Sequence, residues 1–356
     1  MRSRRMNQGT GSQLRVSVVL TVKDEAASLP DLLASLESQT RPADEIVVVD
    51  GGSCDASVAI MRSWQGRLPL HVIEAPGATI AEGRNLALAA ATGDIVAVTD
   101  GGVRLDPTWL ERLVAPFTEP DPPDVVSGFF IGDPRSPTEL ALVVTTLPDA
   151  DEIDAGRFLP SSRSVAFRRS VFIAGIRYPE WLDYCEDVVF DLRLRRAAAR
   201  FRFQPSALVY YRPRPSLRAF ALQYFRYARG DGKAGLFAAR HAIRYATYWI
   251  VLPLVALHRH WSLLTLAFLG AVVYLRRPYR RLWRRHDAYP RAWVVRAALL
   301  VPVVRVIGDI AKQVGYPVGL VWRWRRYGFR RTWRSIPEPV PPLPTVRGEE
   351  TLLPRA

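Results

Sequence analysis

Cysteine is scarce in this sequence of 356 residues, which contains only Cys54 and Cys185. Two thiols so far apart in the chain build neither a disulfide framework nor a cysteine-type zinc site, and a reduced, cytosolic setting is the default. The sequence also lacks the Gly-x-x-x-x-Gly-Lys-Ser/Thr loop, the Gly-x-Ser-x-Gly elbow and the His-Glu-x-x-His motif. These absences argue against a P-loop nucleotidase, an α/β-hydrolase and a zinc metalloprotease.

Acidic residues are scarce in the second part of the chain. The net charge is +15, yet residues 1–213 hold 23 Lys and Arg against 28 Asp and Glu, whereas residues 214–356 hold 26 against 6. The basic residues alternate with long apolar runs, a pattern more typical of a protein at an anionic membrane surface than of one in a DNA groove. We therefore expect a membrane partner and no nucleic acid.

The N-terminus shows no secretory signal. Residues 1–14 form a basic extension, and the apolar run over residues 16–22 is too short for a signal-peptide core before it ends at Lys23-Asp24-Glu25. We expect the bulk of the chain to stay in the cytoplasm.

Residues 15–215 are expected to form an α/β domain with a mostly parallel central sheet flanked by helices. Short β-branched runs alternate with helical patterns, the arrangement of repeated strand-helix-strand units. Ser28 precedes a leucine-rich helical repeat and is expected to cap it. Strands are predicted at residues 16–22, 45–49, 70–74, 94–99 and 125–131, and helices at 29–36, 54–64, 80–91, from 107 onward and at 187–199.

The rest of the chain is expected to be helical and membrane-associated. An acceptor-side interfacial region is predicted over 216–243, a membrane-associated helical region over 244–335 and a proline-rich tail over 336–356. A spanning helix needs about 20 apolar residues, and the apolar run at 245–274 is interrupted by His258-Arg259-His260. A hairpin of two short helices, a re-entrant pair and one tilted span all remain open, as does a soluble second domain with buried helices.

Two further basic stretches support the membrane interpretation. Residues 276–285 contain six arginines with interspersed aromatics, which is typical of an anchor at lipid headgroups. The apolar run over 292–307 is broken by Arg296, Pro302 and Arg305, so we expect it to lie in the interface and not to span.

Acidic residues follow three of the predicted strands. Asp24 and Glu25 follow the first, Asp50 follows the second in an Asp-Gly-Gly turn, and Asp100 follows the fourth in another. In an open α/β sheet the ligand site lies outside the carboxyl ends of the strands. Carboxylates there bind a ribose hydroxyl, a base edge or a metal that carries a diphosphate, so the repetition predicts a nucleotide site.

Four separated blocks resemble the family-2 glycosyltransferases, which have the GT-A nucleotide-sugar-binding fold. The opening strand with its acidic end is similar to the family's S-V-V-I-P-T-Y-N-E, and the second strand to E-I-I-V-V-D-D-G-S-T-D. Gly83-Arg84-Asn85 with the segment 91–95 resembles A-R-N and A-x-G-D-x-I. Cys185-Glu186-Asp187 lies where the family keeps its catalytic Glu-Asp pair. The resemblance covers roughly residues 15 to 230.

This resemblance implies that the donor is bound by Asp24, Glu25, Asp50, Arg84 and Asp100. Asp100 begins the D-x-D signature, whose second acid, the expected ligand of a divalent metal, is replaced by Gly102. Dependence on Mn²⁺ or Mg²⁺ therefore stays open: either Asp100 and the diphosphate hold the metal, or another group such as an arginine takes over part of its charge role.

The resemblance also assigns catalytic and acceptor residues. Asp187 is implied to be the base that deprotonates the acceptor hydroxyl, with Glu186 positioning it. Gln223, Arg226 and Tyr227 resemble the Gln-x-x-Arg-Trp element of the membrane-associated members, where an aromatic platform holds the acceptor and the arginine counters the diphosphate. The block 161–169 resembles an acceptor-side element with Ser164 in the position of an Asn.

The sequence thus predicts an inverting glycosyltransferase in polysaccharide biosynthesis of the cell envelope. It would move a sugar from a nucleotide-diphosphate-sugar to a lipid-linked or cell-surface glycan acceptor at the cell membrane, with its catalytic domain in the cytoplasm. The alternatives are a catalytically inactive membrane scaffold with the same fold and a sugar nucleotidyltransferase, although the arginine- and lysine-bearing loop of the latter is missing after the first strand.

Overall fold

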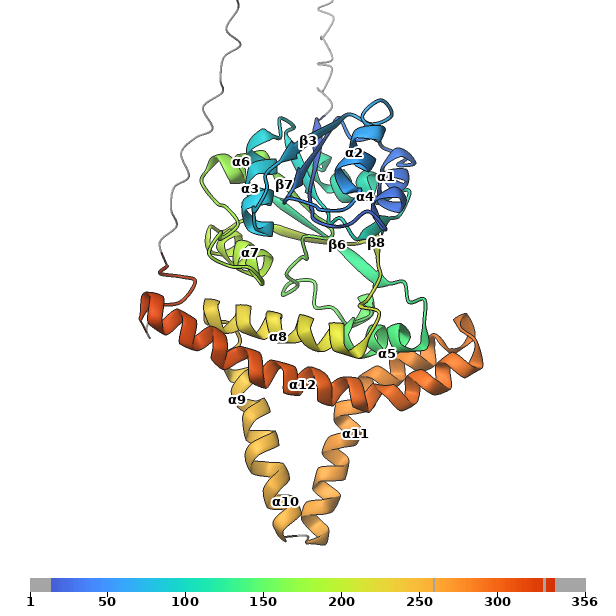
Figure 1. The fold of residues 1–356 in the computed structure, drawn as a ribbon, viewed down its shortest axis with the longest axis vertical. Helices are drawn as coiled ribbons and strands as arrows, with labels where there is room; N and C mark the ends of the chain where they lie inside the picture. Colours follow the sequence, from blue (N-terminus) through green and yellow to red (C-terminus); the bar gives the residue numbers. More distant parts are fainter. Residues whose placement is uncertain (1–13, 259, 329–330, 337–356) are drawn as a thin grey trace, which may run out of the picture.

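The structure is a computed structural model, and it describes residues 14–258, 260–328 and 331–336. Apart from residue 14, the predicted basic extension lies outside the described residues, as does the predicted proline-rich tail beyond Ile336. The described chain consists of an α/β domain, a layer of two long helices against it, and a helical hairpin that points away from both (Figure 1).

One eight-stranded sheet forms the centre of the α/β domain, with the order β3-β2-β1-β4-β7-β6-β8-β5. Strands β3, β2, β1 and β4 are parallel, which confirms the prediction for this half. In the other half β7 runs antiparallel to both its neighbours, and so does β5 to β8, so the sheet is mixed and the expectation of a mostly parallel sheet was too simple. The strands are β1 Val16–Val22, β2 Glu45–Asp50, β3 Leu70–Glu74, β4 Ile95–Val98, β5 Val103–Leu105, β6 Val125–Gly132, β7 Val165–Arg168 and β8 Phe201–Tyr211.

Helices cover both faces of the sheet, and the strands β1, β2 and β4 bury side chains on both sides. Val18 and Leu20 of β1 pack with the leucines of α1 in one core, while Val19 packs with Leu88 of α3 in a second core. The bounds are α1 Leu29–Glu37, α2 Ser57–Trp64, α3 Ile80–Ala90, α4 Trp109–Val114, α5 Pro137–Thr146, α6 Arg169–Ile173 and α7 Glu186–Arg196.

Ser28 does not cap α1 as expected. Its hydroxyl accepts no bond from the helix and donates instead to the Glu25 carboxylate at 2.5 Å. Sequence spacing alone does not distinguish a capping serine from one that holds a neighbouring acid, because both lie just before the helix.

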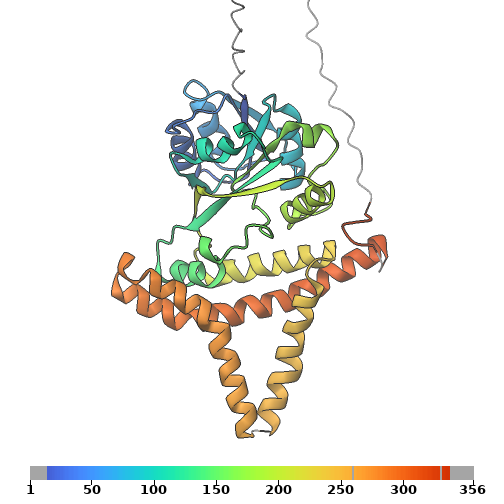
Figure 2. The ribbon, with the colours of Figure 1, turned by 180° about the vertical axis from the view of Figure 1, so that it is seen from behind.

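The C-terminal part begins with α8 Leu217–Ala234, and α12 Arg291–Tyr327 runs alongside it (Figures 1 and 2). Glycines allow the close contact, since a Cβ on Gly232 would lie 2.3 Å from the Tyr316 carbonyl oxygen. Ala297, Val301 and Val304 of α12 are buried with Leu140 of α5, which joins this layer to the α/β domain. The predicted interfacial segment 292–307 is therefore one part of a much longer helix.

The hairpin consists of α9 Ala238–Ala246, a π-helical turn Thr247–Val251, α10 Leu252–His258 and α11 Trp261–Arg284. Its two arms form a V whose tip points away from the α/β domain (Figure 1). Of the arrangements left open by the sequence, the structure has a helical hairpin. None of the helices in the described ranges has both the length and the apolar character needed to cross a bilayer.

Candidate functional site

A cavity of about 1120 Å³ lies at the carboxyl ends of the parallel strands and continues beneath α8 to the base of the hairpin. Its walls come from the ends of β1 and β4, the first turns of α3 and α7, and from α8, α9 and α12. Seven of the predicted site residues line it, namely Glu25, Arg84, Asp100, Glu186, Asp187, Gln223 and Tyr227. Tertiary structure therefore brings together residues that are dispersed over most of the domain.

Arg84 is the charged centre of this cavity. The start of α3 is held by a capping box, in which Thr79 and Glu82 exchange side-chain and backbone hydrogen bonds. Gly83 lets α3 approach β1 closely, because a Cβ there would lie 2.8 Å from the Thr21 Cγ2 atom. Arg84 follows Gly83 in this helix, and its side chain is 2% exposed.

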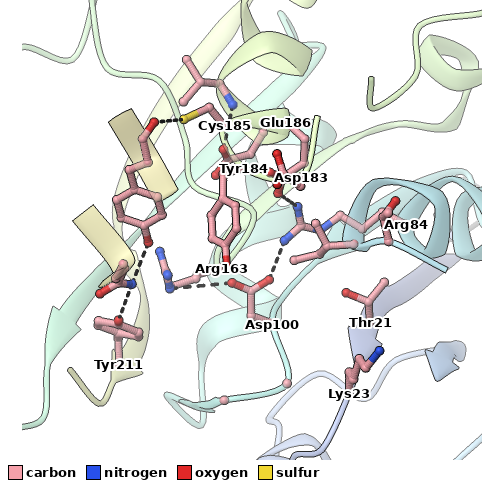
Figure 3. A pocket seen from close by; sticks show the side chains of 18 of the residues that line it. Thr21, Lys23, Arg84, Asp100, Arg163, Asp183, Tyr184, Cys185, Glu186 and Tyr211 are labelled. Atoms are coloured by element: carbon pink, nitrogen blue, oxygen red, sulfur yellow. Dashed lines mark hydrogen bonds and ion pairs between the residues drawn. The ribbon is translucent and has the colours of Figure 1, made fainter. Parts of the chain in front are cut away.

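The Arg84 guanidinium links two acids from distant elements. Its Nη1 donates to Glu186 at 2.5 Å and its Nη2 donates to Asp100 at 2.7 Å (Figure 3). Burial disfavours the charge on Arg84, but the two carboxylates more than offset this and raise its pKa further above its usual range. Arg84 is therefore a permanent cation between the fourth strand and the first turn of α7.

Asp100 is flanked by a second arginine that the sequence analysis did not single out. Arg163 Nε lies 3.7 Å from the Asp100 carboxylate, and its guanidinium lies over the Tyr211 ring at 4.3 Å (Figure 3). Burial raises the pKa of Asp100, yet Arg84 and Arg163 outweigh it, so the pKa lies below its ordinary value. The block that contains Arg163 was noted, but only the fold shows that its arginine reaches the end of β4.

Glu186 and Asp187 form the first turn of α7, where the helix dipole favours negative charge. Glu186 is buried, and burial together with the neighbouring charge of Asp187 raises its pKa to about 7, against the lowering effect of Arg84. Asp187 is partly exposed and lines the cavity. The pair thus consists of one acid that is held by an arginine and one that is open to a ligand.

The residue before this pair is strained. Cys185 has φ of 64°, a left-handed conformation that costs a residue with a Cβ about 1 kcal/mol or more. Its Sγ contacts the Tyr227 carbonyl oxygen at 3.3 Å, and a Cβ on Gly230 would lie 2.9 Å from that sulfur. The close packing of α8 against this turn holds the backbone in the conformation that starts α7.

Asp24 and Asp50 lie beside the cavity and not in its wall. Asp50 is 2% exposed, and its carboxylate accepts bonds from the backbone of Gly52 and from both the backbone and the hydroxyl of Ser53. Asp24 accepts from the Cys54 backbone N–H at 2.8 Å. Both acids hold the loop after β2 in place, and their predicted role as donor ligands stays a prediction.

Of the predicted acceptor element, Gln223 and Tyr227 line the cavity and Arg226 does not. The Gln223 amide donates to the Tyr227 hydroxyl at 2.8 Å, one turn further along α8. Arg226 donates to the Tyr184 hydroxyl at 3.0 Å, next to the acidic pair. Ser164, expected on the acceptor side, is instead buried and bonded to Trp109 and to the Ala207 carbonyl.

The oxygen ligands at the end of β4 do not fit a protein-built metal centre. The Asp100 carboxylate is already paired with two arginines, and Gly102 contributes no side chain. Across the described ranges no three His, Cys, Asp or Glu side chains are grouped as metal ligands. Positive charge at this point of the cavity comes from guanidinium groups.

Comparison with known proteins places this architecture among the GT-A-like folds. The solved structure of the mannosyltransferase PcManGT from Pyrobaculum calidifontis, in complex with GDP-Man and Mn²⁺, superposes with a TM-score of 0.57 at 21% identity, covering 82% of this chain and 88% of that one. Residues 17–172 match the model of the family described as glycosyl transferase family 2. Over these residues the match confirms the resemblance to the family.

Curated relatives carry glycosyltransferase names. Validoxylamine A glucosyltransferase of Streptomyces hygroscopicus subsp. jinggangensis is 33% identical over 144 residues, which are 39% of this chain and 34% of that protein. Pre-mycofactocin glycosyltransferase of Mycobacterium tuberculosis is 30% identical over 238 residues, 64% of this chain and 48% of that protein. The chain therefore spans less than half the length of these relatives.

Proposed function

We propose that the protein is an inverting glycosyltransferase that moves a sugar from a nucleotide-diphosphate-sugar to a lipid-linked or cell-surface glycan. One observation carries the proposal: the Glu186–Asp187 pair opens α7 inside the same cavity as Asp100, with Arg84 bonded to both sides. The family-2 domain supports the reaction class, and the glycosyltransferase names of the relatives agree with it.

In this reaction Asp187 acts as the base. The acceptor hydroxyl oxygen attacks the anomeric carbon, its proton passes to the Asp187 carboxylate, and the bond between the anomeric carbon and the diphosphate oxygen breaks. The electron pair leaves with the nucleoside diphosphate, and the configuration inverts. Glu186, held by Arg84, fixes the first turn of α7 so that Asp187 faces the acceptor.

The leaving diphosphate needs compensating positive charge. Arg163 lies at the end of β4 beside Asp100 and lines the cavity, so its guanidinium is suited to meet the charge that develops on the leaving oxygens. Glu25 lies next to the Gly101-Gly102 turn and lines the cavity, where its carboxylate is suited to bind a hydroxyl of the nucleoside.

We further propose that the hairpin associates with the cytoplasmic face of the cell membrane. Large apolar side chains are exposed on both arms, with Leu257 75%, Trp261 83% and Phe268 67% exposed. Arginines follow on α11, and exposed cations beside an apolar surface favour anionic headgroups. The hairpin is apolar toward its tip and carries arginines further along α11, so it is suited to insert into one leaflet of the membrane. This position would bring the cavity next to lipid-linked acceptors.

The test is nucleoside-diphosphate release by detergent-purified protein from UDP-, GDP- and dTDP-sugars, with and without Mn²⁺ or Mg²⁺, in the presence of membrane lipid extract. Release from one donor supports the proposal and names the base and sugar. Formation of pyrophosphate from a sugar phosphate and a nucleoside triphosphate indicates the sugar nucleotidyltransferase instead. Absence of turnover and of donor binding indicates the inactive scaffold.

A further inference from the structure

The cavity has a second, cationic end that none of the assigned roles uses. Beyond Tyr227 its wall is formed by side chains at the base of the hairpin, where α9 and α12 meet (Figure 1). The basic side chains here come from two helices that are more than sixty residues apart in the chain: Arg240, His241, Arg244 and Lys312.

Only part of this positive charge is compensated by acids. Arg244 Nε pairs with the Asp309 carboxylate at 2.7 Å, and His241 Nε2 lies 3.1 Å from Asp231. Among the described residues, no carboxylate is within ion-pair distance of Arg240 or of Lys312. Within the described ranges, the exposed Arg240 and the partly buried Lys312 are thus cations of this cavity that form no direct ion pair.

Lys312 is the more unusual of the two. Its Nζ lies over the Tyr224 ring at 4.7 Å, and burial together with Arg244 lowers its pKa to about 8. Asp309 and Asp231 oppose this lowering of the pKa, but neither forms a direct ion pair with Lys312, so an anion at the Nζ atom would complete the site. An anion would restore the ordinary charged state of this lysine, since an opposite charge favours the protonated form.

A line of contacts connects this end to the reaction centre. Asp231, the partner of His241, also lies 3.5 Å from the Cys185 Sγ, directly before the acidic pair. Tyr224, beneath Lys312, packs against Tyr227 with ring centroids 5.8 Å apart. Asp231, Cys185 and Tyr227 line the same cavity as Asp187, so a ligand bound at the cationic end would extend toward Asp187 within one cavity.

We infer that Arg240 and Lys312 bind the anionic phosphate of the acceptor at the base of the hairpin. This rests on the proposed function, because it identifies the acceptor as a lipid whose polar part is joined to its tail through a phosphate or diphosphate. The tail would follow the exposed apolar side chains of the hairpin, and the sugar hydroxyl would reach Asp187. Each cation would donate charge-assisted hydrogen bonds to the phosphate, and such bonds are stronger than those between neutral groups.

The inference is tested by calorimetric binding of dodecyl phosphate to the detergent-purified full chain, with dodecanol and inorganic phosphate as comparisons. Wild type is expected to bind dodecyl phosphate at least tenfold more tightly than either. The double variant Arg240→Gln/Lys312→Gln should lose about tenfold or more of that affinity. Lys312→Arg, which keeps the charge, and Arg62→Gln, which removes an exposed cation of α2 outside the cavity, should stay within about threefold.

Equal affinity of wild type and the double variant, with unchanged melting temperature, overturns the inference, as does binding of dodecanol equal to that of dodecyl phosphate. Inorganic phosphate binding as tightly as dodecyl phosphate shows a site for free phosphate and overturns the lipid assignment. Binding of UDP, GDP or dTDP is measured on the same samples. Nucleotide binding without dodecyl phosphate binding rejects the acceptor site alone. Binding of dodecyl phosphate without any nucleotide contradicts the proposed function and the acceptor role with it.

Discussion

Arg84 and Glu186 are 102 positions apart in sequence, and their side chains meet at 2.5 Å in the interior of the protein. This ion pair joins α3, which packs on the parallel half of the sheet, to the first turn of α7. Since Arg84 also bonds Asp100, one buried guanidinium determines how the end of β4 and the acidic pair are placed relative to each other.

Removal of the Arg84 charge is expected to destabilise the fold. Arg84→Gln leaves Asp100 and the buried Glu186 without their common partner, which should lower the free energy of unfolding by about 3–5 kcal/mol. Arg84→Lys keeps the positive charge but loses the fork geometry of the guanidinium, so its free energy of unfolding should lie between those of wild type and Arg84→Gln. Urea unfolding followed by circular dichroism measures this, and a loss below about 1 kcal/mol for Arg84→Gln contradicts the structural role of the pair.

Loss of the proposed base should affect transfer and not binding. Asp187→Asn is expected to lower the rate of sugar transfer by ~100-fold or more, because the acceptor hydroxyl loses its proton acceptor, while the donor still binds within about threefold. Glu119→Gln, which removes an exposed carboxylate that pairs with Arg202, is the matched control and should leave the rate unchanged. Wild-type rates for Asp187→Asn would remove Asp187 from the mechanism.

The stability of the protein should fall as the pH rises through the range in which Glu186 ionises. Its pKa is raised from 4.5 to about 7, so the folded state holds the proton more tightly than the unfolded chain does. The resulting stabilisation is complete below about pH 4.5 and is lost as the pH rises toward and past 7.

In Glu186→Gln this contribution is absent. Denaturant unfolding at pH 5, 6, 7 and 8 should show a shallower decline in the variant, by up to about 1.4 kcal/mol per pH unit. Burial also raises the pKa of Asp191, but that effect is common to both proteins and cancels in the comparison. Parallel curves for wild type and variant speak against a protonated Glu186.

The incomplete acidic signature yields a prediction on metal dependence. Since Asp100 is paired with Arg84 and Arg163, chelation with EDTA should reduce the wild-type rate by less than about tenfold. Gly102→Asp adds the second carboxylate, and there is room for it, because a Cβ at this position would lie 3.5 Å from the nearest Glu25 oxygen. The variant should show a stronger response to Mn²⁺ than wild type in the same assay. Complete loss of wild-type activity in EDTA argues that a metal is needed in spite of the arginines.

Membrane binding is expected to depend on the tip of the hairpin. The double variant Trp261→Glu/Phe268→Glu should weaken flotation with phosphatidylglycerol-containing vesicles by more than tenfold, because each side chain contributes about 1.5–3 kcal/mol when buried in an apolar environment. Ile173→Glu changes an equally exposed apolar side chain on α6 of the α/β domain and serves as the control. Unchanged flotation of the double variant would mean that another surface binds the lipid.

Much of the fold was predictable because local patterns are strong where both faces of a strand are buried. The apolar runs of β1 and β2 and the leucine spacing of α1 predicted the bounds of these three elements to within one or two residues. The mixed half of the sheet was not predictable, since the reversal of β7 between β4 and β6 depends on pairing partners that are distant in sequence. The length of α12 was not predicted either: the apolar run 292–307 was interpreted as a separate interfacial segment because Arg296, Pro302 and Arg305 interrupt it, yet it lies inside one long helix.

The sequence by itself determined the resemblance to the glycosyltransferase family, because short motifs place acids after β1, β2 and β4 and contain the Glu186–Asp187 pair in the family's order. Only the tertiary structure decided which of these side chains share one cavity. The Asp50 carboxylate accepts hydrogen bonds from the backbone of its own loop, whereas Arg163, just before β7, lies beside Asp100 at the end of β4. The tertiary structure also places Lys312 of α12 in the wall of the same cavity. The physical reason is that charge pairing depends on distances of a few ångströms in space, and separation along the chain does not reveal them.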